Sequence, residues 1–441
     1  MRFGVVGGGL LGMTTAWNLV KAGHQVTIFE AAADCGGLAS PWQLGDVVWD
    51  RHYHVTLYSD LALRALLGEL GLEDELRWVT AQTGFYVDGA MNPFSGALDY
   101  LRFPPLSLIQ KFRLGTTILK ASRITDWRPL ERETAVEWLT RHCGRDTVER
   151  IWLPLLRAKL GPNAERASAA FIWAIIARMY AARRTGSKRE LFGYVRGGYR
   201  RTLQRFEREL RRRGVEIRTS CPVKRVEPFA DGIAVASDSR VDRFDRAIVT
   251  LAPPLAARLC PTLTAQERTL CLGVEYQGIL CASLLLDAPL TPYYITNIAD
   301  GSVPFTAVIE MTALVDRSEL GGKALVYLPK YVTRNDPAFA LEDGAIEELF
   351  LSALGRMHPT FSRKDVRAFR VSRVPYVFPI PTLDYSHRLP PMRTATRGLF
   401  IASSAHIVNG TLNVNETVGL ANRVTAQVLA EPVSSPGAAV A

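Results

Sequence analysis

The first thirty residues alternate between short apolar runs and an amphipathic stretch. Residues 3–6 and 25–29 are apolar runs of the kind that form buried strands. Between them, residues 10–22 place apolar side chains at helical spacing, and Gly23 stands where such a helix would end. Glu30 closes the second run. This strand–helix–strand unit predicts a parallel sheet.

The pattern of apolar positions changes twice further along the chain. Helical periodicity dominates from about residue 61 to residue 180, with breaks at Pro104-Pro105 and Gly161-Pro162. Strand patterns then return and alternate with single helices. Predicted helices are 61–70, 134–142, 147–156, 167–180, 202–213, 343–354 (with Asp343 as its N-cap) and 416–429. Predicted strands are 215–218, 223–226, 233–236, 247–251, 280–286, 305–310, 324–328 and 398–402.

This order of elements predicts an α/β protein with two interleaved domains. A Rossmann-like nucleotide-binding domain would be assembled from the discontinuous segments 1–95, 190–260 and 390–430. An α+β substrate domain would take residues 96–189 and 261–389. Residues 431–441 are small and polar, and we expect them to form a disordered tail.

The charge of the chain indicates which kinds of partner it could bind. The formal net charge is +10, concentrated in basic runs that include residues 183–184, 188–189 and 200–213. Such runs favour anionic partners such as phosphates or acidic lipids, and the alternative is a solvated helix face. No recognition module for nucleic acid accompanies the charge, so we expect no nucleic-acid partner.

The six cysteines form no Cys-x-x-Cys pair and no zinc-like spacing with histidine, which predicts reduced thiols, no metal site and a cytoplasmic location. Neither an export leader nor an apolar run of about 18 residues stands in the sequence, so no membrane-spanning segment is expected.

A glycine fingerprint lies between the first strand and the first helix. Gly7-Gly8-Gly9-Leu10-Leu11-Gly12 matches Gly-x-Gly-x-x-Gly. Gly7 permits the turn, Gly9 lets a pyrophosphate approach the backbone, and Gly12 lets the helix pack on the sheet. The N–H groups at the start of the helix would face the phosphates, and Glu30 would accept the ribose hydroxyls. Together these features predict a dinucleotide site.

A second pair of glycines distinguishes the kind of dinucleotide. Gly36-Gly37-Leu38 begins six residues after Glu30 and allows another close approach to the pyrophosphate. With this spacing the sequence resembles the flavin-containing amine oxidase superfamily, which includes protoporphyrinogen oxidases, phytoene-desaturase-like enzymes and UDP-galactopyranose mutases. The resemblance implies FAD as the cofactor.

The resemblance extends through the middle and the end of the chain. It implies that the backbone at Val223 contacts the adenine, after the stretch 196–199 and the strand at 214–217. Residues 247–250 resemble the third sheet element, and residues 398–402 resemble the final strand. The helix beginning near Asn415-Glu416-Thr417-Val418 would then face the isoalloxazine ring. Ser403-Ser404 replaces the Gly-Asp that the superfamily often carries, so Ser404 would meet the flavin chain without a carboxylate.

Candidate residues for the chemistry begin with the cluster Asp50-Arg51-His52-Tyr53-His54. It resembles the His-x-Phe-His stretch of UDP-galactopyranose mutases, where a histidine lies beside the flavin. His52 could hydrogen-bond the ring or move a proton near neutral pH. The alternative is that both histidines are packing or hydrogen-bonding partners.

Further candidates lie in the predicted substrate domain. Lys159 or Arg157 could bind an anionic group, or could be solvated helix charges. Tyr294, beside Tyr293, and Tyr376 could wall a substrate cavity, or could be core residues. Amine oxidases often carry a lysine near the flavin in the strand after the third sheet element. The matching residues 276–286 contain no lysine, which argues against a straightforward amine oxidase.

Three functions remain open at this stage. The first is dehydrogenation of a C–C or C–N bond in a fairly apolar or lipid-linked small molecule, with oxygen or a membrane quinone as the electron acceptor. The second is a non-redox flavoenzyme, a mutase or isomerase of a nucleotide- or lipid-linked sugar. The third is a binding protein that uses FAD structurally. Residues 171–180 and the basic runs after them could contact the inner face of a membrane, or could cover the substrate domain.

Overall fold

A five-stranded parallel sheet gathers segments from the start, the middle and the end of the chain. In the computed structural model, which describes residues 1–183, 191–408 and 412–431, the strand order is β10-β2-β1-β14-β20. Every neighbouring pair in this sheet is parallel. The strands are β1 (Arg2–Val6), β2 (Gln25–Phe29), β10 (Glu216–Arg218), β14 (Arg246–Val249) and β20 (Leu399–Ile401). The predicted Rossmann-like sheet built from discontinuous segments is therefore confirmed.

Both faces of this sheet are buried at its central strands, so β1, β2, β14 and β20 are apolar except at their starts and at Thr27. Phe3, Val5 and Ile28 point to one face, where they pack with helices. Val6 and Phe29 point to the other face, into a separate cluster. The helices of the first face are α1 (Leu10–Lys21), α2 (Leu61–Glu69), α9 (Gly198–Arg212) and α13 (Val414–Ala430). The second face is covered by β11 (Val223–Phe229), β12 (Gly232–Ser237), β13 (Val241–Phe244), α10 (Pro253–Leu259) and part of α11 (Ala265–Leu272).

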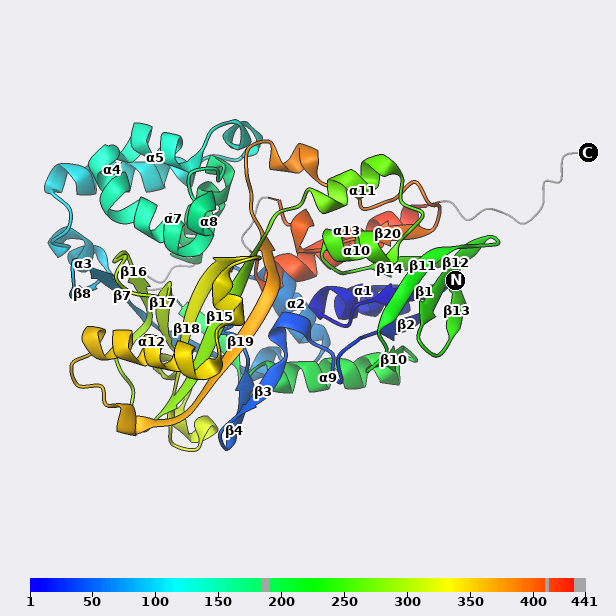
Figure 1. The fold of residues 1–441 in the computed structure, drawn as a ribbon, viewed down its shortest axis with the longest axis horizontal. Helices are drawn as coiled ribbons and strands as arrows, with labels where there is room; N and C mark the ends of the chain where they lie inside the picture. Colours follow the sequence, from blue (N-terminus) through cyan, green and yellow to red (C-terminus); the bar gives the residue numbers. More distant parts are fainter. Residues whose placement is uncertain (184–190, 409–411, 432–441) are drawn as a thin grey trace, which may run out of the picture.

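A second, seven-stranded sheet forms the other half of the molecule (Figure 1). Its pairs are antiparallel except for the parallel pair of β7 and β16. The helix α12 (Asp343–Met357) packs on one face of it. In order, the strands are β19 (Val366–Pro379), β15 (Tyr276–Leu286), β18 (Ala324–Thr333), β17 (Ala307–Glu310), β16 (Tyr293–Ile298), β7 (Gln82–Val87) and β8 (Ala90–Pro93).

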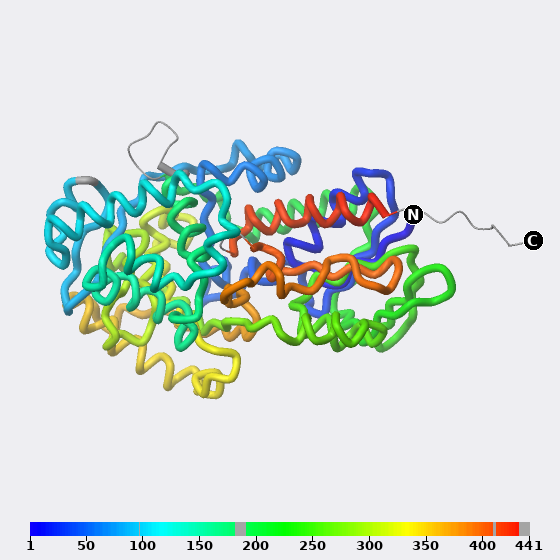
Figure 2. The backbone as a smooth tube through the Cα atoms, turned by 90° about the horizontal axis from the view of Figure 1, so that it is seen from above, coloured from blue at the N-terminus to red at the C-terminus, as the bar shows by residue number. Residues whose placement is uncertain are grey.

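A helical insertion covers the outer end of this second sheet. Figure 2 shows it at the opposite end of the long axis from the chain's N-terminus. Its helices are α3 (Ala97–Arg102), α4 (Leu108–Ala121), α5 (Ala135–Cys143), α6 (Arg145–Thr147), α7 (Leu153–Leu160) and α8 (Ala169–Arg183), with a π-helical turn at Val148–Trp152 before α7. Two small sheets complete the described fold: the hairpin of β3 (Pro41–Leu44) and β4 (Val47–Asp50), and the sheet of β5 (Thr56–Leu57), β9 (Leu191–Val195) and β6 (Leu76–Thr80).

The structure corrects several local predictions. Asp343 is not the N-cap of α12: Glu342 takes that position, and the Asp343 carboxylate accepts from Arg373 at 2.6 Å. The last helix begins at Val414, two residues earlier than predicted, because the Asn413 side chain caps it. The predicted division placed β7 and β8 with the nucleotide segments, whereas both strands pair in the seven-stranded sheet. The tail predicted at 431–441 lies outside the described residues after Glu431, as does the basic run 188–189.

The apolar part of α8 is buried. Phe171, Ile172 and Trp173 are each less than a tenth exposed and pack among the helices of the insertion. For this part of residues 171–180, the structure supports the interpretation as a covering helix.

Candidate functional site

A cavity of about 910 Å³ runs from the carboxyl end of the parallel sheet to the seven-stranded sheet. Ligands of open α/β sheets bind at this end of the strands. The nucleotide end of the cavity is lined by Gly7, Gly9, Glu30, Gly36 and Gly37. Its other walls come from both sheets and from the helical insertion, including Phe85, Phe94, Leu114, Ile118, Ile151, Ile279, Tyr294, Tyr331 and Tyr376.

The glycine fingerprint forms a backbone cradle at the start of α1. Gly7 has a φ of +111°, and a Cβ on Gly12 would lie 1.9 Å from the Gly7 carbonyl oxygen, so both positions require glycine. A Cβ on Gly9, in contrast, would have only the Gly37 Cα within 4 Å, at 3.9 Å. The space above Gly9 is therefore open to the cavity. The N-terminal N–H groups of α1, at Leu10 and Leu11, face this space without a side-chain cap, which suits a pyrophosphate.

Glu30 holds the cradle in shape from the end of β2. Its Oε2 accepts from the Gly8 N–H at 2.6 Å and its Oε1 accepts from the Ala32 N–H at 2.8 Å. A carboxylate has about four acceptor positions, so two remain for hydroxyl donors. Glu30 also lines the cavity, which fits the predicted role of accepting the ribose hydroxyls.

The second pair of glycines closes the opposite side of the cradle. Gly36 has a φ of +131°, and its N–H donates to the Gly8 carbonyl oxygen at 2.9 Å. Gly37 follows with a φ of +59°, and Leu38 continues the wall of the cavity. Two backbone segments without side chains thus meet at the nucleotide end.

The family resemblance pointed to residues 415–418 as neighbours of the flavin. In the structure, some of these residues line the cavity and others hold the surrounding helices in place. Thr417 lines the cavity, whereas Val418 is buried in the core below α13. The Asn415 Oδ1 accepts from the Ala62 and Leu63 N–H groups at 3.0 and 3.1 Å, so Asn415 caps α2. Glu416 is the residue whose N–H the Asn413 side chain caps.

Of two further positions that the family resemblance pointed to, Ser404 lines the cavity, whereas Val223 is not among the described residues that line it. Val223 lies in β11, two residues after Cys221, whose N–H donates to the Glu30 carbonyl oxygen at 2.8 Å. Ser404 lines the cavity, and its Oγ lies 3.3 Å from the Tyr276 hydroxyl.

His52 is buried beside the second glycine pair and engages both of its ring nitrogens. Its Nδ1 lies 3.1 Å from the Leu38 carbonyl oxygen and its Nε2 lies 3.1 Å from the Ser372 Oγ. Burial lowers the pKa of His52 to about 3, so the ring is neutral at physiological pH. A neutral ring that donates through Nδ1 and accepts through Nε2 satisfies both contacts.

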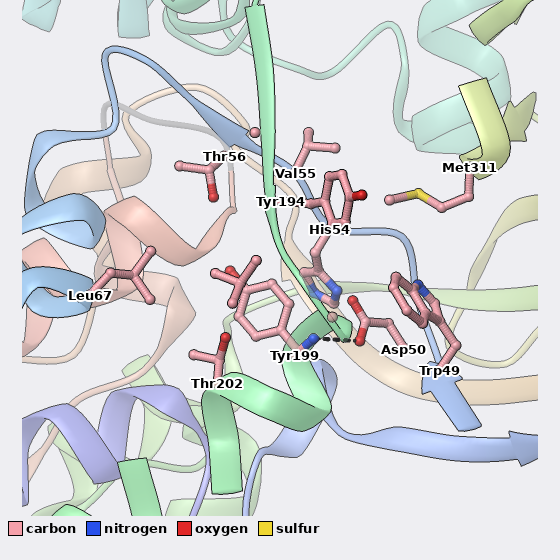
Figure 3. Close-up of a pocket in the computed structure, with 13 residues that line it drawn as sticks. Trp49, Asp50, His54, Val55, Thr56, Leu67, Tyr194, Tyr199, Thr202 and Met311 are labelled. Atoms are coloured by element: carbon pink, nitrogen blue, oxygen red, sulfur yellow. Dashed lines mark hydrogen bonds between the residues drawn. The ribbon is translucent and has the colours of Figure 1, made fainter. Parts of the chain in front are cut away.

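His54 faces the main cavity and also a small cavity behind it. The small cavity measures about 10 Å³, room for about one water molecule. Figure 3 shows Asp50, His54 and Trp49 grouped beside Tyr199, and the Asp50 Oδ1 accepts from the Tyr199 N–H at 2.8 Å. Asp50 thereby caps the start of α9. Burial raises the pKa of Asp50 to about 7 and lowers the pKa of His54 to about 4.

Aromatic side chains form the wall above the nucleotide end. Tyr294 and Tyr376 line the cavity, Tyr294 is also part of a buried core cluster, and the Tyr276 and Tyr376 rings meet edge to face at 5.4 Å between centroids. The sequence did not single out Tyr331, whose hydroxyl lies 3.3 Å from that of Tyr53. The strand β18 was predicted to end five residues too early, before Tyr331. Only the alternation of side chains along the full strand could have indicated that Tyr331 lines the cavity.

Lys159 lies behind this wall. Its Nζ is 5.6 Å from the ring centroids of both Tyr331 and Phe378, and burial lowers its pKa to about 8. The described residues that line the cavity include Tyr331 but neither Lys159 nor Arg157. Arg157 instead pairs with Glu165 at 2.7 Å on the surface.

The geometry of the cradle fits a dinucleotide cofactor, and a comparison with protein families identifies which one. Residues 12–429 match the model of the family described as flavin containing amine oxidoreductase. The chain belongs to this family. A flavin is the cofactor of this family, and FAD, the cofactor predicted from Glu30 and Gly36-Gly37, is confirmed.

Individual relatives are distant. The chain is 28% identical over 216 residues to a protein named probable zeta-carotene desaturase from Synechococcus elongatus, covering 43% of this chain and 44% of that protein. It is 25% identical over 162 residues to protoporphyrinogen oxidase 2 of Arabidopsis thaliana, covering 35% of this chain and 32% of that protein. The matched region thus spans less than half the length of these relatives.

The fold is shared more widely than the sequence. The structure of a reduced UDP-galactopyranose mutase matches with a TM-score of 0.74 at 14% identity, covering 98% of this chain and 96% of that chain. At this identity the match shows the fold alone.

None of the helices in the described residues combines the length and apolarity needed to cross a membrane. Within the same part of the chain, no group of three or more His, Cys, Asp or Glu side chains is placed to hold a metal ion.

Proposed function

We propose that this enzyme dehydrogenates a C–C or C–N bond of a fairly apolar or lipid-linked small molecule. The substrate would lie in the cavity between the glycine cradle and the seven-stranded sheet. Oxygen or a membrane quinone would be the electron acceptor. The enzyme would work in the cytoplasm, with peripheral contact at the inner face of the membrane.

The observation that carries this proposal is the charge of the cavity wall. Of the described residues that line the cavity, only Glu30 and Arg178 are Asp, Glu, Lys or Arg residues. Glu30 belongs to the nucleotide end. Arg178 pairs with Asp60 at 3.0 Å, and that carboxylate is 4% exposed. Because Arg178 is already paired with Asp60, the cavity wall offers no free charge to a charged substrate. The cavity therefore favours a substrate with little charge.

The cofactor supplies hydride acceptance when it is bound. The chain's own residues bind and orient the reactants around it. The cradle at Gly9 and Gly37 receives the pyrophosphate, and Glu30 receives the ribose. The aromatic wall at Tyr276, Tyr294 and Tyr376 excludes water and presses an apolar substrate toward the cofactor. His52, neutral and held at both nitrogens, keeps the Leu38 backbone in place.

A sugar mutase is the second candidate, and the fold match to the galactopyranose mutase allows it. A nucleotide-linked sugar carries two phosphates, which need cations such as arginine in the wall. Arg178 is the one cation among the described lining residues, and it is paired. The cavity therefore supports the dehydrogenase better than the mutase.

Two neighbouring residues of α4 provide a matched test. Ile118 lines the cavity, whereas Leu119 is 40% exposed on the outer side of the same helix. We expect Ile118→Asp to lower kcat/KM for an apolar substrate by at least about tenfold while FAD content stays unchanged, because a carboxylate then faces the substrate. Leu119→Asp should leave kcat/KM within about twofold. Equal kcat/KM in both variants would contradict the proposed substrate position.

A further inference from the structure

Two residues separate the small cavity of about 10 Å³ from the main cavity. Among the described residues, His54 and Val55 are the ones that line both cavities. The Val55 side chain is apolar, whereas an imidazole ring can donate at one nitrogen and accept at the other. His54 is therefore the side chain through which the two cavities can exchange a proton.

Polar groups without protein partners surround the small cavity, and Figure 3 shows the residues that carry them grouped together. The Trp49 Nε1 and the His54 Nδ1 are buried and have no hydrogen-bond partner among the described residues. The Asp50 Oδ1 accepts from the Tyr199 N–H at 2.8 Å, but within the described part of the chain nothing donates to its Oδ2. Trp49 and Asp50 are each only 3% exposed. Because buried polar groups are nearly always hydrogen-bonded and a buried water makes about three such bonds, these groups form a site for one water molecule.

No cation neutralises Asp50 at this site. The described residues that line the small cavity include no lysine or arginine and no acid besides Asp50. Tyr194 and Tyr199 line it, and the Tyr327 hydroxyl donates to the Asp50 carbonyl oxygen at 2.5 Å. Burial raises the pKa of all three tyrosines, so they stay neutral, and Glu319 accepts from the Tyr194 hydroxyl at 2.9 Å. The unpaired Asp50 carboxyl, with a pKa that burial raises to about 7, can therefore both take up and release a proton near neutral pH.

We infer that one water molecule binds in the small cavity and passes protons between His54 and Asp50, which gives the main cavity a proton store behind its wall. The direction of transfer rests on the proposed function, because dehydrogenation removes a proton from the substrate together with the hydride that the cofactor accepts.

The transfer balances without a charged histidine. His54, protonated at Nδ1, takes the substrate proton at its other ring nitrogen and gives the Nδ1 proton to the water. The water passes one of its own protons to the Asp50 carboxylate. One N–H bond forms on His54 and one breaks, so the ring ends neutral as the other tautomer, the water is unchanged and Asp50 becomes a carboxylic acid. The reverse steps return the proton to the main cavity after the product has left.

The carboxyl proton of Asp50 allows a test that needs no substrate. The FAD-loaded enzyme is held at about pH 5, where Asp50 is protonated, and diluted into D₂O of the same acidity. Infrared spectroscopy follows the shift of the carboxyl C=O band, which is assigned by its loss in Asp50→Asn. We expect His54→Gln to slow this shift by at least about tenfold, because a glutamine amide cannot pass a proton from one atom to another as the ring does.

His358→Gln is the matched control. His358 is 8% exposed, its Nε2 has no hydrogen-bond partner among the described residues, and burial lowers its pKa, but it lines neither cavity. This variant should exchange the Asp50 proton as fast as the unmodified enzyme does. A crystal structure of the unmodified FAD-loaded enzyme should show one water within hydrogen-bond distance of the Asp50 carboxyl and the His54 ring.

Three results would overturn the inference. These are equal exchange rates in His54→Gln and His358→Gln, absence of the Asp50 carboxyl band at about pH 5, and a crystal structure with no water in the small cavity. None of these measurements needs turnover, so they stand apart from the proposed function. Failure of the proposed function would appear instead as flavin bands that no apolar candidate substrate bleaches, with the exchange rates unaffected.

Discussion

His52 joins the two halves of the molecule: its Nε2 lies 3.1 Å from the Ser372 Oγ of β19, while its Nδ1 lies 3.1 Å from the Leu38 carbonyl oxygen beside the cradle. The sequence suggested a histidine that moves protons near neutral pH. The structure gives its ring two protein partners and a pKa of about 3, and so favours a positioning role.

The first prediction concerns the pH dependence of His52. Its folded pKa lies below the ordinary value of 6.5, so its neutral form contributes stability above pH 6.5 that is lost as pH falls toward 3. We expect the pH profile of kcat between 5 and 8 to be the same for the unmodified enzyme and for Ser372→Ala.

His52→Ala should keep FAD and lose most turnover, because Leu38 is no longer held. Turnover that survives in His52→Ala would contradict this role. So would a limb of the pH profile of kcat near pH 6.5 that the His52→Ala substitution removes.

The second prediction concerns Glu30. Its carboxylate accepts from the Gly8 N–H at 2.6 Å and lines the end of the cavity where we propose that the ribose binds. Hydrogen bonds to a charged group contribute about 1.5–3 kcal/mol, so Glu30→Ala should weaken FAD binding by about 10- to 100-fold. Fluorescence titration of the flavin-free protein measures this directly. Glu227→Ala, at a partly exposed residue of β11 that pairs with Arg225 at 2.7 Å, serves as the control, and equal FAD affinity in the two variants would refute the ribose assignment.

The third prediction separates cofactor binding from folding at two glycines of the fingerprint. Gly12→Ala would place a Cβ 1.9 Å from the Gly7 carbonyl oxygen, so we expect it to disrupt the fold locally. Among the residues that the structure describes, the new methyl group of Gly9→Ala would have only the Gly37 Cα within 4 Å, at 3.9 Å, so the flavin-free variant should melt near the unmodified flavin-free protein. The same methyl group occupies the pyrophosphate position, so FAD affinity should fall by at least about a hundredfold. Normal FAD binding by Gly9→Ala would place the phosphates elsewhere.

These glycines show why the nucleotide half could be predicted. The strand, the turn and the helix are adjacent in sequence, and each glycine is required by backbone geometry within a few residues. Asn415 shows the opposite case. It was expected to face the flavin, yet it caps α2 through residues more than 350 positions earlier, a contact that no local pattern specifies.

The substrate half was less predictable for a related reason. The strand β19 is 14 residues long, but Arg367, Arg370 and Arg373 interrupt its apolar positions, and their partners lie on distant segments. No strand was predicted there. Lys159 was interpreted as an anion-binding residue or a solvated helix charge, but tertiary packing places its Nζ beside aromatic rings outside the cavity wall.

The fourth prediction concerns Asp50, whose folded pKa of about 7 lies above its ordinary value of 3.8. The folded protein holds a proton there that the unfolded chain releases, so this residue contributes stability at low pH that is lost as pH rises toward 7. Each pH unit in that window corresponds to about 1.4 kcal/mol. Asp50→Asn keeps the acceptor for the Tyr199 N–H and cannot ionise.

Melting temperatures of Asp50→Asn and the unmodified enzyme, compared from pH 4 to pH 8, check this prediction. The variant should gain relative stability as pH rises through the window and then level off. A stability difference that does not change with pH would show that Asp50 is ionised throughout, as a carboxylate stabilised by the start of α9.

Anaerobic visible absorption spectra of the purified protein test the proposed dehydrogenase most directly. They are recorded before and after the addition of candidate substrates of three groups: apolar or lipid-linked molecules, amines and nucleotide sugars. We predict oxidised flavin bands that bleach with a member of the apolar or lipid-linked group and with no nucleotide sugar. Flavin bands that no apolar candidate bleaches, with conversion of a nucleotide sugar only after chemical reduction, would contradict the dehydrogenase. A protein that neither carries flavin nor takes up added FAD would contradict the assignment of the cradle itself.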